Sequence, residues 1–465
     1  MPPVRKPSRA WRLDLFRRRL ATDIRMLSFT KMRFMDRYLG SLLCSGFSLL
    51  DRAEHRPERS LEEPLQLQKI LVTKYFGMGS LILATPMVRA LRRRYPNAHI
   101  DLLTIEQNRK LTEILPVFDQ LYTVETRSLW SVVRSMIAAL RHIRRQRYDV
   151  VIDAEFFSRL SSLVSYFARA RYSVGFYLPE IWRGNFLTHP VHFNYYRHAI
   201  LAFMALAKSV GAESSDYALE PPAISTDIVD NVRAKLQAMA VQPGQRIVCV
   251  NVNTGPLSPE RRWPEENFAE LIRLVLCEFR ETTILLIGAP SDLPLVTDVH
   301  NLLGSDAQGR VFNIAGKFSL AELCGLLTMS EALISNDSGP LHLAEALTIP
   351  TVSFFGPETP LIYGPTGEGH VVFYKGIYCS PCLNVHNQKK APCNGNNVCM
   401  KLISPDEVFA SLRMLLQGEH VPSPFRVAFD VSADQLLTDY RSFRSPSLSA
   451  PDTVPVTVLS GQARE

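Results

Sequence analysis

The segment at residues 332–364 limits the possible folds most, because a strand, a helix and a second strand follow one another there with glycine turns between them. We predict a buried strand at Ala332–Ser335, a turn at Asp337-Ser338-Gly339 that opens a helix, and a strand at Thr351–Phe355. In a parallel α/β sheet both turns lie at the carboxyl ends of strands, where ligands bind. Glycine permits close approach of a ligand, and the N–H groups at a helix start favour an anion. The simpler alternative, that Asp337 or Ser338 only caps the helix, does not explain the second strand and turn.

The same alternation of strands and helices fills most of the chain, in two series. The first has predicted strands at residues 69–73, 99–104, 121–124 and 150–153, and helices at 81–95, 132–146, 159–168 and 194–210. The second has strands at 246–251, 283–288, 311–313, 332–335 and 351–355, and helices at 227–240, 267–279, 293–303, 319–329 and 405–416. Such alternation predicts α/β domains with parallel sheets covered by helices on both faces. We expect two doubly wound, Rossmann-like domains, at residues 65–222 and 223–417, facing across a cleft in which both hold the substrate.

The basic charge of the chain is concentrated at its start. Residues 1–40 hold eleven Lys or Arg against three Asp, a net charge of +8, while the whole chain has +7. The rest is therefore close to neutral, which argues against a nucleic-acid-binding protein. Residues 1–64 form a basic extension with apolar residues at near-helical spacing, which either lies on an anionic membrane surface or packs on the protein's own body. We find no spanning segment and no secretory signal, and expect a partly disordered tail at residues 418–465.

Two further motifs suit a phosphate-bearing ligand. The turn after the first strand, Lys74–Ser80, contains Gly77 and Gly79, which suit close contact with a ligand or with another domain. It lacks the full dinucleotide fingerprint, so we do not predict a nicotinamide enzyme. Arg261 and its neighbour Arg262 follow the strand at residues 246–251, where they either clamp a phosphate or form a solvated charge pair. Because the sequence contains no D-x-D, arginines, lysines and helix N-termini would have to meet the charge of a diphosphate.

Eight cysteines fall into two groups. Four gather within 21 residues in a C-x2-C-x10-C-x5-C pattern, at Cys379, Cys382, Cys393 and Cys399. This pattern allows a structural zinc site with four thiolates, although the last spacing is looser than usual. Disulfides are the alternative, but a cytosolic chain usually keeps its thiols reduced. The other four lie in apolar surroundings and are predicted core residues: Cys44, Cys249, Cys277 and Cys324.

Over residues 69–415 the chain resembles the glycosyltransferase family 9 heptosyltransferases, which adopt the GT-B fold. Four stretches carry the resemblance: Lys74–Ser80 followed by Thr85-Pro86, Arg261–Pro264, Asn336-Asp337-Ser338-Gly339-x2-His342, and Phe355-Gly356-Pro357-x-Thr359-Pro360. The resemblance implies a metal-independent, inverting transfer of a sugar from a nucleotide-diphosphate donor, typically ADP-heptose. The acceptor is typically the lipid-linked core of lipopolysaccharide, on the cytoplasmic side of the inner membrane. A UDP- or GDP-sugar transferase for another surface glycan, and a degenerate nucleotide-sugar-binding protein, remain alternatives.

The resemblance also implies roles for individual residues. The donor would be contacted from the C-terminal domain by five residues: Asn336, Asp337, Ser338, Gly339 and His342. Arg261 stands where the family often has a lysine that meets the diphosphate, and Asp292 falls near an acidic residue that binds the ribose. Lys74 would assist from the other domain.

One residue departs from the family pattern. In many members an aspartate, proposed as the base that deprotonates the acceptor, occupies the position of Ser80. Serine is no base at neutral pH without an activating partner. Asp153 and Glu155, at the end of another strand, are alternative carboxylates, although we prefer the interpretation that Asp153 only caps the next helix.

Overall fold

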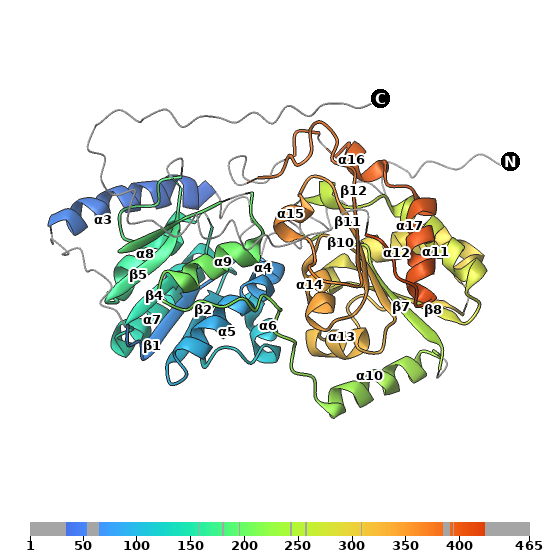
Figure 1. Cartoon of the computed structure of the whole chain (residues 1–465), viewed down its shortest axis with the longest axis horizontal. Coiled ribbons are helices and arrows are strands. Elements are labelled where there is room, and N and C mark those ends of the chain that lie inside the picture. Colours follow the sequence, from blue (N-terminus) through green and yellow to red (C-terminus); the bar gives the residue numbers. More distant parts are fainter. Residues whose placement is uncertain are drawn as a thin grey trace, which may run out of the picture. The chain divides into compact units, whose positions relative to one another are not determined.

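The computed structural model describes residues 34–53 and 65–423, apart from residues 157, 179–180, 195, 242–243, 256–257, 308, 385–390 and 394. Within these residues the chain forms two six-stranded parallel sheets with helices packed against them (Figure 1). The predicted α/β class with two parallel sheets is confirmed.

The first sheet, sheet A, has the strand order β3-β2-β1-β4-β5-β6. Its strands are β1 (Lys69–Thr73), β2 (His99–Ile105), β3 (Gln120–Val124), β4 (Val150–Asp153), β5 (Tyr172–Tyr177) and β6 (His189–His192). The helices of this half are α4 (Met78–Leu83), α5 (Thr85–Arg94), α6 (Arg109–Ile114), α7 (Leu129–Gln146), α8 (Arg159–Ala168) and α9 (Ala199–Lys208). The order reverses between β1 and β4, so the carboxyl ends of these two strands form the switch point of sheet A.

The second sheet, sheet B, has the order β12-β11-β10-β7-β8-β9. Its strands are β7 (Arg246–Asn251), β8 (Thr282–Ile287), β9 (Val311–Asn313), β10 (Ala332–Asn336), β11 (Thr351–Phe355) and β12 (His370–Tyr374). Its helices are α10 (Thr226–Ala238), α11 (Glu265–Glu278), α12 (Leu293–Leu303), α13 (Leu320–Leu327), α14 (Gly339–Ala346), α15 (Pro360–Tyr363), α16 (Val398–Lys401) and α17 (Pro405–Leu416). The switch point of sheet B lies between β7 and β10.

Several predicted elements differ from the observed ones. The expected helix at residues 81–95 is two helices, α4 and α5, because Pro86 lies in the first turn of α5 and starts a new helix there. The turn expected at residues 77–80 is already helical from Met78. The helix expected at residues 194–210 is shorter, beginning at Ala199. Strands β5, β6 and β12 were not predicted from the sequence; β6 contains a proline and lies at the sheet edge, where the missing N–H costs nothing.

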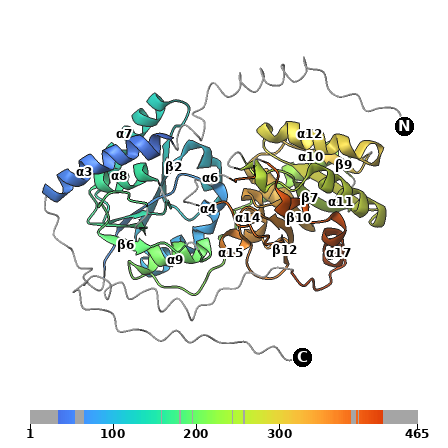
Figure 2. The same cartoon turned by 90° about the horizontal axis from the view of Figure 1, so that it is seen from above.

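The part of the basic extension that the structure describes packs on the protein's own body. Residues 34–53 contain a short π-helical segment, Asp36–Gly40, followed by α3 (Ser41–Ala53), which packs beside α8 (Figure 2). The fully buried Cys44 lies in an apolar cluster with Leu163, Tyr166 and Phe186. The apolar positions predicted nearer the start of the chain, and the predicted linker and tail, lie largely outside the described residues. None of the described helices is both long enough and apolar enough to cross a bilayer.

Asp36 fixes the start of α8. Its carboxylate accepts hydrogen bonds from the backbone N–H groups of Arg159 and Leu160 and from the Ser158 hydroxyl, at 2.8–3.1 Å. A carboxylate at a helix N-terminus satisfies donors that have no partner within the helix and interacts favourably with the helix dipole. The extension is therefore joined to α8 by polar contacts as well as by apolar packing.

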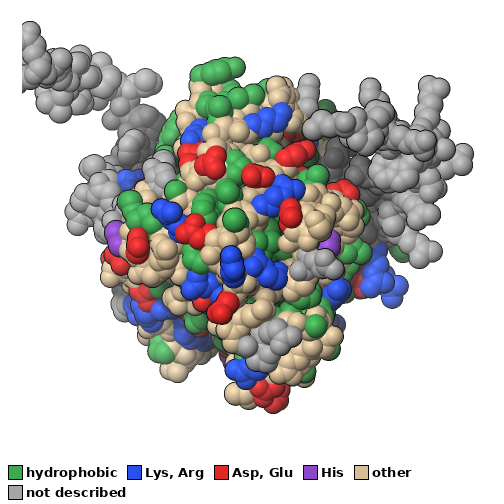
Figure 3. All heavy atoms as spheres, turned by 90° about the vertical axis from the view of Figure 1, so that its right-hand side faces the viewer, with side chains coloured by type: hydrophobic (Ala, Val, Ile, Leu, Met, Phe, Trp, Pro, Cys, Tyr) green, Lys and Arg blue, Asp and Glu red, His purple; other side chains and the backbone are tan. Residues whose placement is uncertain are grey.

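The face on the right-hand side of Figure 1 has an ordinary, mixed surface. Figure 3 shows acidic and basic side chains interspersed over it, with no large region of one sign among the coloured residues. Such a surface suits contact with water.

Candidate functional site

The switch point of sheet B brings Arg261 and Asp337 together. Arg261 ends a 3-10 turn in the loop after β7, and Asp337 directly follows β10, its neighbour in the sheet. The Arg261 guanidinium contacts an Asp337 carboxylate oxygen at 2.8 Å, and also donates to the backbone carbonyls of Asp337 and Thr254. Its Nε–H is buried and has no hydrogen-bond partner among the described residues. One donor of a buried guanidinium is therefore unused at the edge where ligands bind.

The charge of Arg261 is secured by its neighbours. Burial acts to lower the pKa of Arg261, but the carboxylates of Asp337 and Glu358 outweigh burial and raise the pKa. A permanent, planar cation in this position can bind two oxygens of a phosphate at once.

Trp263 anchors the loop that carries Arg261. Its indole is buried, stacks on Phe354 of β11 with ring centroids 4.3 Å apart, and donates to the carbonyl of Ile403 at 2.9 Å. Its backbone N–H donates to the side-chain oxygen of Asn336, whose amide nitrogen in turn donates to the Val252 carbonyl. The predicted site residue Asn336 is fully buried and holds the loops after β7 and β10 together.

The beginning of α14 is not capped by a side chain. Ser338 occupies the cap position, but its hydroxyl accepts from the Asn251 amide at 2.8 Å and lies 3.0 Å from the Ser335 hydroxyl. Asp337 is engaged with Arg261. The alternative that either residue merely caps the helix is therefore wrong, and the start of α14 lacks the internal partner that would compete with an anion.

Asp292 lies beside the same edge, after β8. Its carboxylate accepts a hydrogen bond from the backbone N–H of Ala289 at 2.9 Å. If residue 288 were not glycine, its Cβ atom would lie 3.1 Å from the Cβ atom of Asp292. Asn253, whose amide nitrogen lies 2.8 Å from the same position, has a buried side-chain oxygen without a hydrogen-bond partner among the described residues. The ribose role of Asp292 stays a prediction, and Asn253 is a neighbouring polar group that the sequence analysis missed.

Sheet A carries a comparable ion pair at its own switch point. The Lys74 ammonium, after β1, lies 2.9 Å from a carboxylate oxygen of Glu155, after β4, and both side chains are buried. The same Glu155 oxygen accepts the backbone N–H groups of Tyr75 and Phe76 at 2.6 and 2.8 Å. This pair shapes the loop after β1. Contact of Lys74 with the donor stays a prediction.

Asp153 is enclosed by protein groups. It is fully buried, accepts from the hydroxyls of Thr73 and Ser161 at 3.1 and 3.0 Å, and pairs with the guanidinium of Arg183. It makes no contact with the first backbone N–H groups of α8, which Asp36 and Ser158 cap, so our alternative prediction that Asp153 caps this helix was wrong. These contacts leave no open side for an acceptor hydroxyl, and a catalytic role for Asp153 stays untested.

Ser80 lies in the first turn of α4 and is partly exposed. Its hydroxyl makes no hydrogen bond to a histidine or a carboxylate among the described residues, so no group of that part of the chain activates it. Its catalytic role stays a prediction.

The two predicted glycine turns meet each other. Helix α4, after β1, packs against α14, after β10. A Cβ on Gly79 would lie 2.7 Å from the Cδ2 atom of His342, and one on Gly339 would lie 2.1 Å from the terminal methyl of Met78. Both glycines therefore allow the N-terminal and C-terminal halves to approach closely. For Gly79, contact with another domain was one of the two predicted roles, whereas Gly339 was expected to contact a ligand.

His342 lies at this contact and is held from the C-terminal side. Its Nδ1 atom is 3.2 Å from Glu345, which also accepts the backbone N–H and the hydroxyl of Thr366, at 2.7 and 2.9 Å. Burial acts to raise the pKa of Glu345, but the hydrogen bond and the charge of His342 outweigh it, so the pKa is lowered. His342 is thus oriented by an ionised carboxylate toward the start of α4.

His198 forms a second bridge between the halves. It begins α9, its Nδ1 accepts the backbone N–H of Ile200 at 3.3 Å, and its Nε2 lies 2.9 Å from the carbonyl of Gly364. Because Nδ1 accepts, Nε2 carries the proton and the ring is neutral. Burial lowers the pKa of His198 to about 4, against an opposing effect of the Gly364 carbonyl and the charge of Glu345.

We expect the free energy of unfolding to fall as the pH is lowered from 6.5 to 4, because unfolded His198 takes up a proton in this range and folded His198 does not. The pKa difference corresponds to about 3 kcal/mol. Urea unfolding at pH 7 and pH 4.5 measures the loss, and His198→Asn should reduce it. An equal loss in both proteins would contradict the assignment to His198.

The four clustered cysteines surround the turn after β11. The backbone N–H of Cys382 donates to the Pro357 carbonyl, and the Cys399 sulfur lies 2.8 Å from where a Cβ on Gly356 would be. Burial, then the neighbouring thiols, raise the pKa values of Cys382 and Cys399 to about 11. Among the described residues, no three of these sulfurs lie within 4.8 Å of one another, whereas the sulfurs of a tetrahedral zinc site lie closer together than that. The sulfurs do not fit a zinc ion in this arrangement, and the zinc site stays a prediction.

Outside this cluster, the predicted burial of the other cysteines is confirmed for Cys44, Cys249 and Cys324. It is wrong for Cys277, which is exposed on α11.

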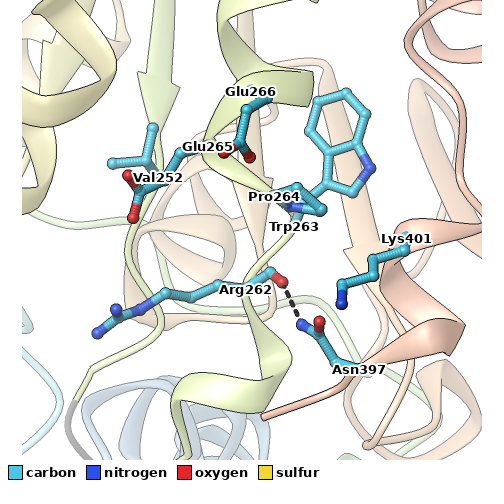
Figure 4. A pocket seen from close by; sticks show the side chains of 8 residues that line it. All are labelled: Val252, Arg262, Trp263, Pro264, Glu265, Glu266, Asn397 and Lys401. Atoms are coloured by element: carbon cyan, nitrogen blue, oxygen red, sulfur yellow. Dashed lines mark hydrogen bonds between the residues drawn. The ribbon is translucent and has the colours of Figure 1, made fainter. Parts of the chain in front are cut away.

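A cavity of about 320 Å³ lies on the outer side of the Trp263 loop (Figure 4). It is lined by Val252, Arg262, Trp263, Pro264, Glu265, Glu266, Asn397 and Lys401. The Asn397 amide donates to the Arg262 carbonyl at 2.7 Å, which ties this loop to the residues before α16. Arg262 lines this cavity, whereas Arg261 pairs with Asp337, so the two neighbouring arginines have different surroundings.

Comparison with solved structures establishes the class. The family 9 glycosyltransferase of Veillonella parvula aligns with a TM-score of 0.62 at 22% identity, covering 76% of this chain and 99% of that chain. The ADP-heptose lps heptosyltransferase II of E. coli aligns with a TM-score of 0.60 at 20% identity, with the same coverage. Two doubly wound parallel sheets of this kind make the chain a GT-B protein.

Sequence comparison then gives the family. The model of glycosyltransferase family 9 (heptosyltransferase) matches residues 136–392, more than half of the chain. Lipopolysaccharide heptosyltransferase 2 of Salmonella typhimurium is 23% identical over 364 residues, covering 76% of this chain and all of the relative. Lipopolysaccharide heptosyltransferase 3 of E. coli K12 is 24% identical over 368 residues, covering 75% and 98%. The chain belongs to glycosyltransferase family 9, and it is a glycosyltransferase.

Proposed function

We propose that this enzyme transfers a heptose from ADP-heptose to the lipid-linked core of lipopolysaccharide. The names of the curated relatives support the sugar and the acceptor, and the similarity to the ADP-heptose heptosyltransferase II of E. coli supports the nucleotide. The observation that carries the proposal is the pairing of Arg261 with Asp337 at the switch point of sheet B, next to an uncapped helix start. A nucleotide diphosphate needs such an anion site.

The proposed mechanism is a single displacement with inversion. The acceptor hydroxyl attacks the anomeric carbon from the face opposite the departing diphosphate. Negative charge grows on the diphosphate as the bond breaks, and the Arg261 guanidinium and the backbone N–H groups at the start of α14 stabilise it. The acceptor proton leaves late, toward water, because neither Ser80 nor Asp153 offers an accessible base. No divalent ion takes part, so we expect turnover to persist in excess EDTA.

The proposed acceptor also implies a location. A lipid-linked acceptor would be met at the cytoplasmic face of the inner membrane, and we propose that the enzyme works there as a peripheral protein. The basic sequence of residues 1–33 supports this, because anionic lipids attract such segments.

Binding and turnover with different nucleotides test the proposal. We expect calorimetry to show ADP binding at least about tenfold tighter than UDP or GDP, a difference of about 1.4 kcal/mol. Single-turnover assays with labelled ADP-heptose and a lipopolysaccharide core acceptor should then show transfer. Tighter UDP or GDP binding would support a transferase for another surface glycan, and binding without turnover would support a degenerate, non-catalytic protein, which the serine at position 80 favours.

The variant Ser80→Asp tests whether the base position limits the reaction. We expect kcat with ADP-heptose to rise by about tenfold to a hundredfold, because a carboxylate at this place can accept the acceptor proton during attack. Ser80→Asn is the matched control, since it has similar size without a basic oxygen of comparable strength. No change in kcat, with the parent active, would rule out that Ser80 limits the chemistry.

A further inference from the structure

The outer side of the N-terminal extension is unusually apolar for an exposed surface. While Cys44 and Ser48 face α8, the opposite side of the helical segment carries large apolar side chains, and Leu42 is 70% exposed. The exposed members are Phe34, Tyr38, Leu39, Leu42, Leu49 and Leu50. Residues 38–50 contain no charged side chain. A contiguous apolar face of this kind marks an interaction surface.

A second helix adds apolar and basic side chains. The exposed side of α7 carries four apolar residues, of which Trp130 is 75% exposed: Leu129, Trp130, Val133 and Ile137. The same helix contains four exposed arginines and no Asp or Glu: Arg134, Arg141, Arg144 and Arg145. This combination of tryptophan, aliphatic residues and arginines on one helix is typical of helices that lie in the headgroup region of a bilayer.

The two helices belong to the same layer of the molecule. Both α3 and α7 pack against α8, and Figure 2 shows these helices on one side of sheet A, with α9 on the other. The chain before α3 adds a strong charge of one sign, because residues 1–33 hold ten Lys or Arg and two Asp. The apolar side chains of α7 are thus accompanied by arginines on the same helix, whereas the face in Figure 3 mixes both signs.

We propose that the outer faces of α3 and α7 form one docking surface for a bilayer that contains anionic lipids. Leu42, Leu49 and Trp130 enter the headgroup boundary, and the arginines of α7 meet the lipid phosphates. The proposal rests on the proposed function, since it places the enzyme where a lipid-linked acceptor would be. Apolar insertion and electrostatic attraction each give weak binding alone and add when combined.

Flotation of the full chain with vesicles tests this surface, using phosphatidylcholine with about 30 mol% phosphatidylglycerol against phosphatidylcholine alone. We expect binding to the anionic vesicles only. Leu42→Ser/Leu49→Ser on α3, and separately Trp130→Ser on α7, should each reduce binding by about tenfold or more, because apolar area no longer leaves water. Leu302→Ser/Leu402→Ser, at leucines that are 42% and 51% exposed in the C-terminal half, is the control, and it should bind as the parent does.

Charge is tested separately. Arg134→Gln/Arg141→Gln should weaken binding to anionic vesicles and reduce its dependence on salt, since fewer cations meet the lipid headgroups. Deletion of residues 1–33 should weaken binding but leave the effect of the α3 substitutions measurable.

Several outcomes would overturn the proposal. No vesicle binding by the parent, or unchanged binding by both the α3 and the α7 variants, would show that these faces do not meet lipid. If light scattering shows that the parent forms dimers and the α3 variant does not, while both still bind vesicles, the outer face of α3 contacts a second copy of this chain and not lipid. ADP calorimetry on the same samples distinguishes failure of the docking surface from failure of the proposed function. If the protein binds ADP but not vesicles, the docking surface is wrong and the proposed function is unaffected.

Discussion

Replacing Arg261 by alanine should lower kcat/KM with ADP-heptose by about a hundredfold to a thousandfold, as removal of one charged donor from a site of developing charge does. The guanidinium is buried beside Asp337 and retains an unused Nε–H, so it is placed to meet diphosphate oxygens. Calorimetry with ADP should show weakening of about a hundredfold. Arg261→Lys keeps the positive charge but loses the planar, two-pronged guanidinium group. Its kcat/KM and its affinity for ADP should lie between those of the parent and the alanine variant.

The alanine substitution also leaves Asp337 buried without its partner, at a cost of about 3 kcal/mol in the free energy of unfolding. The double variant Arg261→Ala/Asp337→Asn removes this charge and separates stability from binding. If the double variant recovers stability and also binds ADP as the parent does, Arg261 is not a diphosphate ligand. Arg273→Ala, on the surface of α11, is the control for loss of an arginine elsewhere.

Replacing Gly79 by alanine should lower kcat for transfer by about tenfold to a hundredfold, while ADP binding changes by less than about threefold. The new Cβ would lie 2.7 Å from the His342 ring, which is buried and held by Glu345, so the ring has little room to move. The contact between α4 and α14 would have to open. ADP would still bind, because its main proposed contacts, Arg261 and the start of α14, belong to the C-terminal half.

Two glycine variants serve as controls for this contact. Gly46→Ala, on the exposed side of α3, meets no atom within 4 Å and should behave as the parent. A Cβ on residue 339 would lie 2.1 Å from the terminal methyl of Met78, while the Cβ and Cγ atoms of Met78 lie at an ordinary contact distance of 3.4 Å. Met78→Ala should therefore restore the activity of Gly339→Ala and should not restore that of Gly79→Ala. Normal transfer by Gly79→Ala would show that the contact between the halves is not needed for turnover.

The sequence predicted the sheets well because their strands are short, apolar and bounded by clear turns. The predicted limits of β1, β4, β7, β9 and β11 agree with the structure, and so does the meeting of the loops after β7 and β10, because parallel strands end at one edge. The pairing of Arg261 with Asp337 follows from this topology. Asn251, which holds the same loops, has no pattern of its own, since any buried residue at a strand end looks similar. Trp263 lies in the Arg261–Pro264 stretch of the family resemblance, but the sequence does not show that its ring stacks on Phe354.

Other features depend on contacts between segments far apart in the chain. Nothing near Gly79 in the sequence indicates that its neighbour is His342 and not a ligand, because glycine is required equally by both kinds of close approach. Asp153 looked like a helix cap because it precedes α8, but the cap comes from Asp36, more than a hundred residues earlier. The Lys74–Glu155 pair likewise joins two loops that only the sheet order brings together.

The hydrogen bonds of Asp36 affect how this enzyme can be shortened. A chain trimmed to start at β1 would lose the carboxylate that caps α8 and would expose Leu163, Tyr166 and Phe186 to water. Truncation before residue 34 removes the most basic sequence and keeps the cap. The catalytic domain of this protein therefore begins earlier than its first strand, and a shortened form made for expression should keep that boundary.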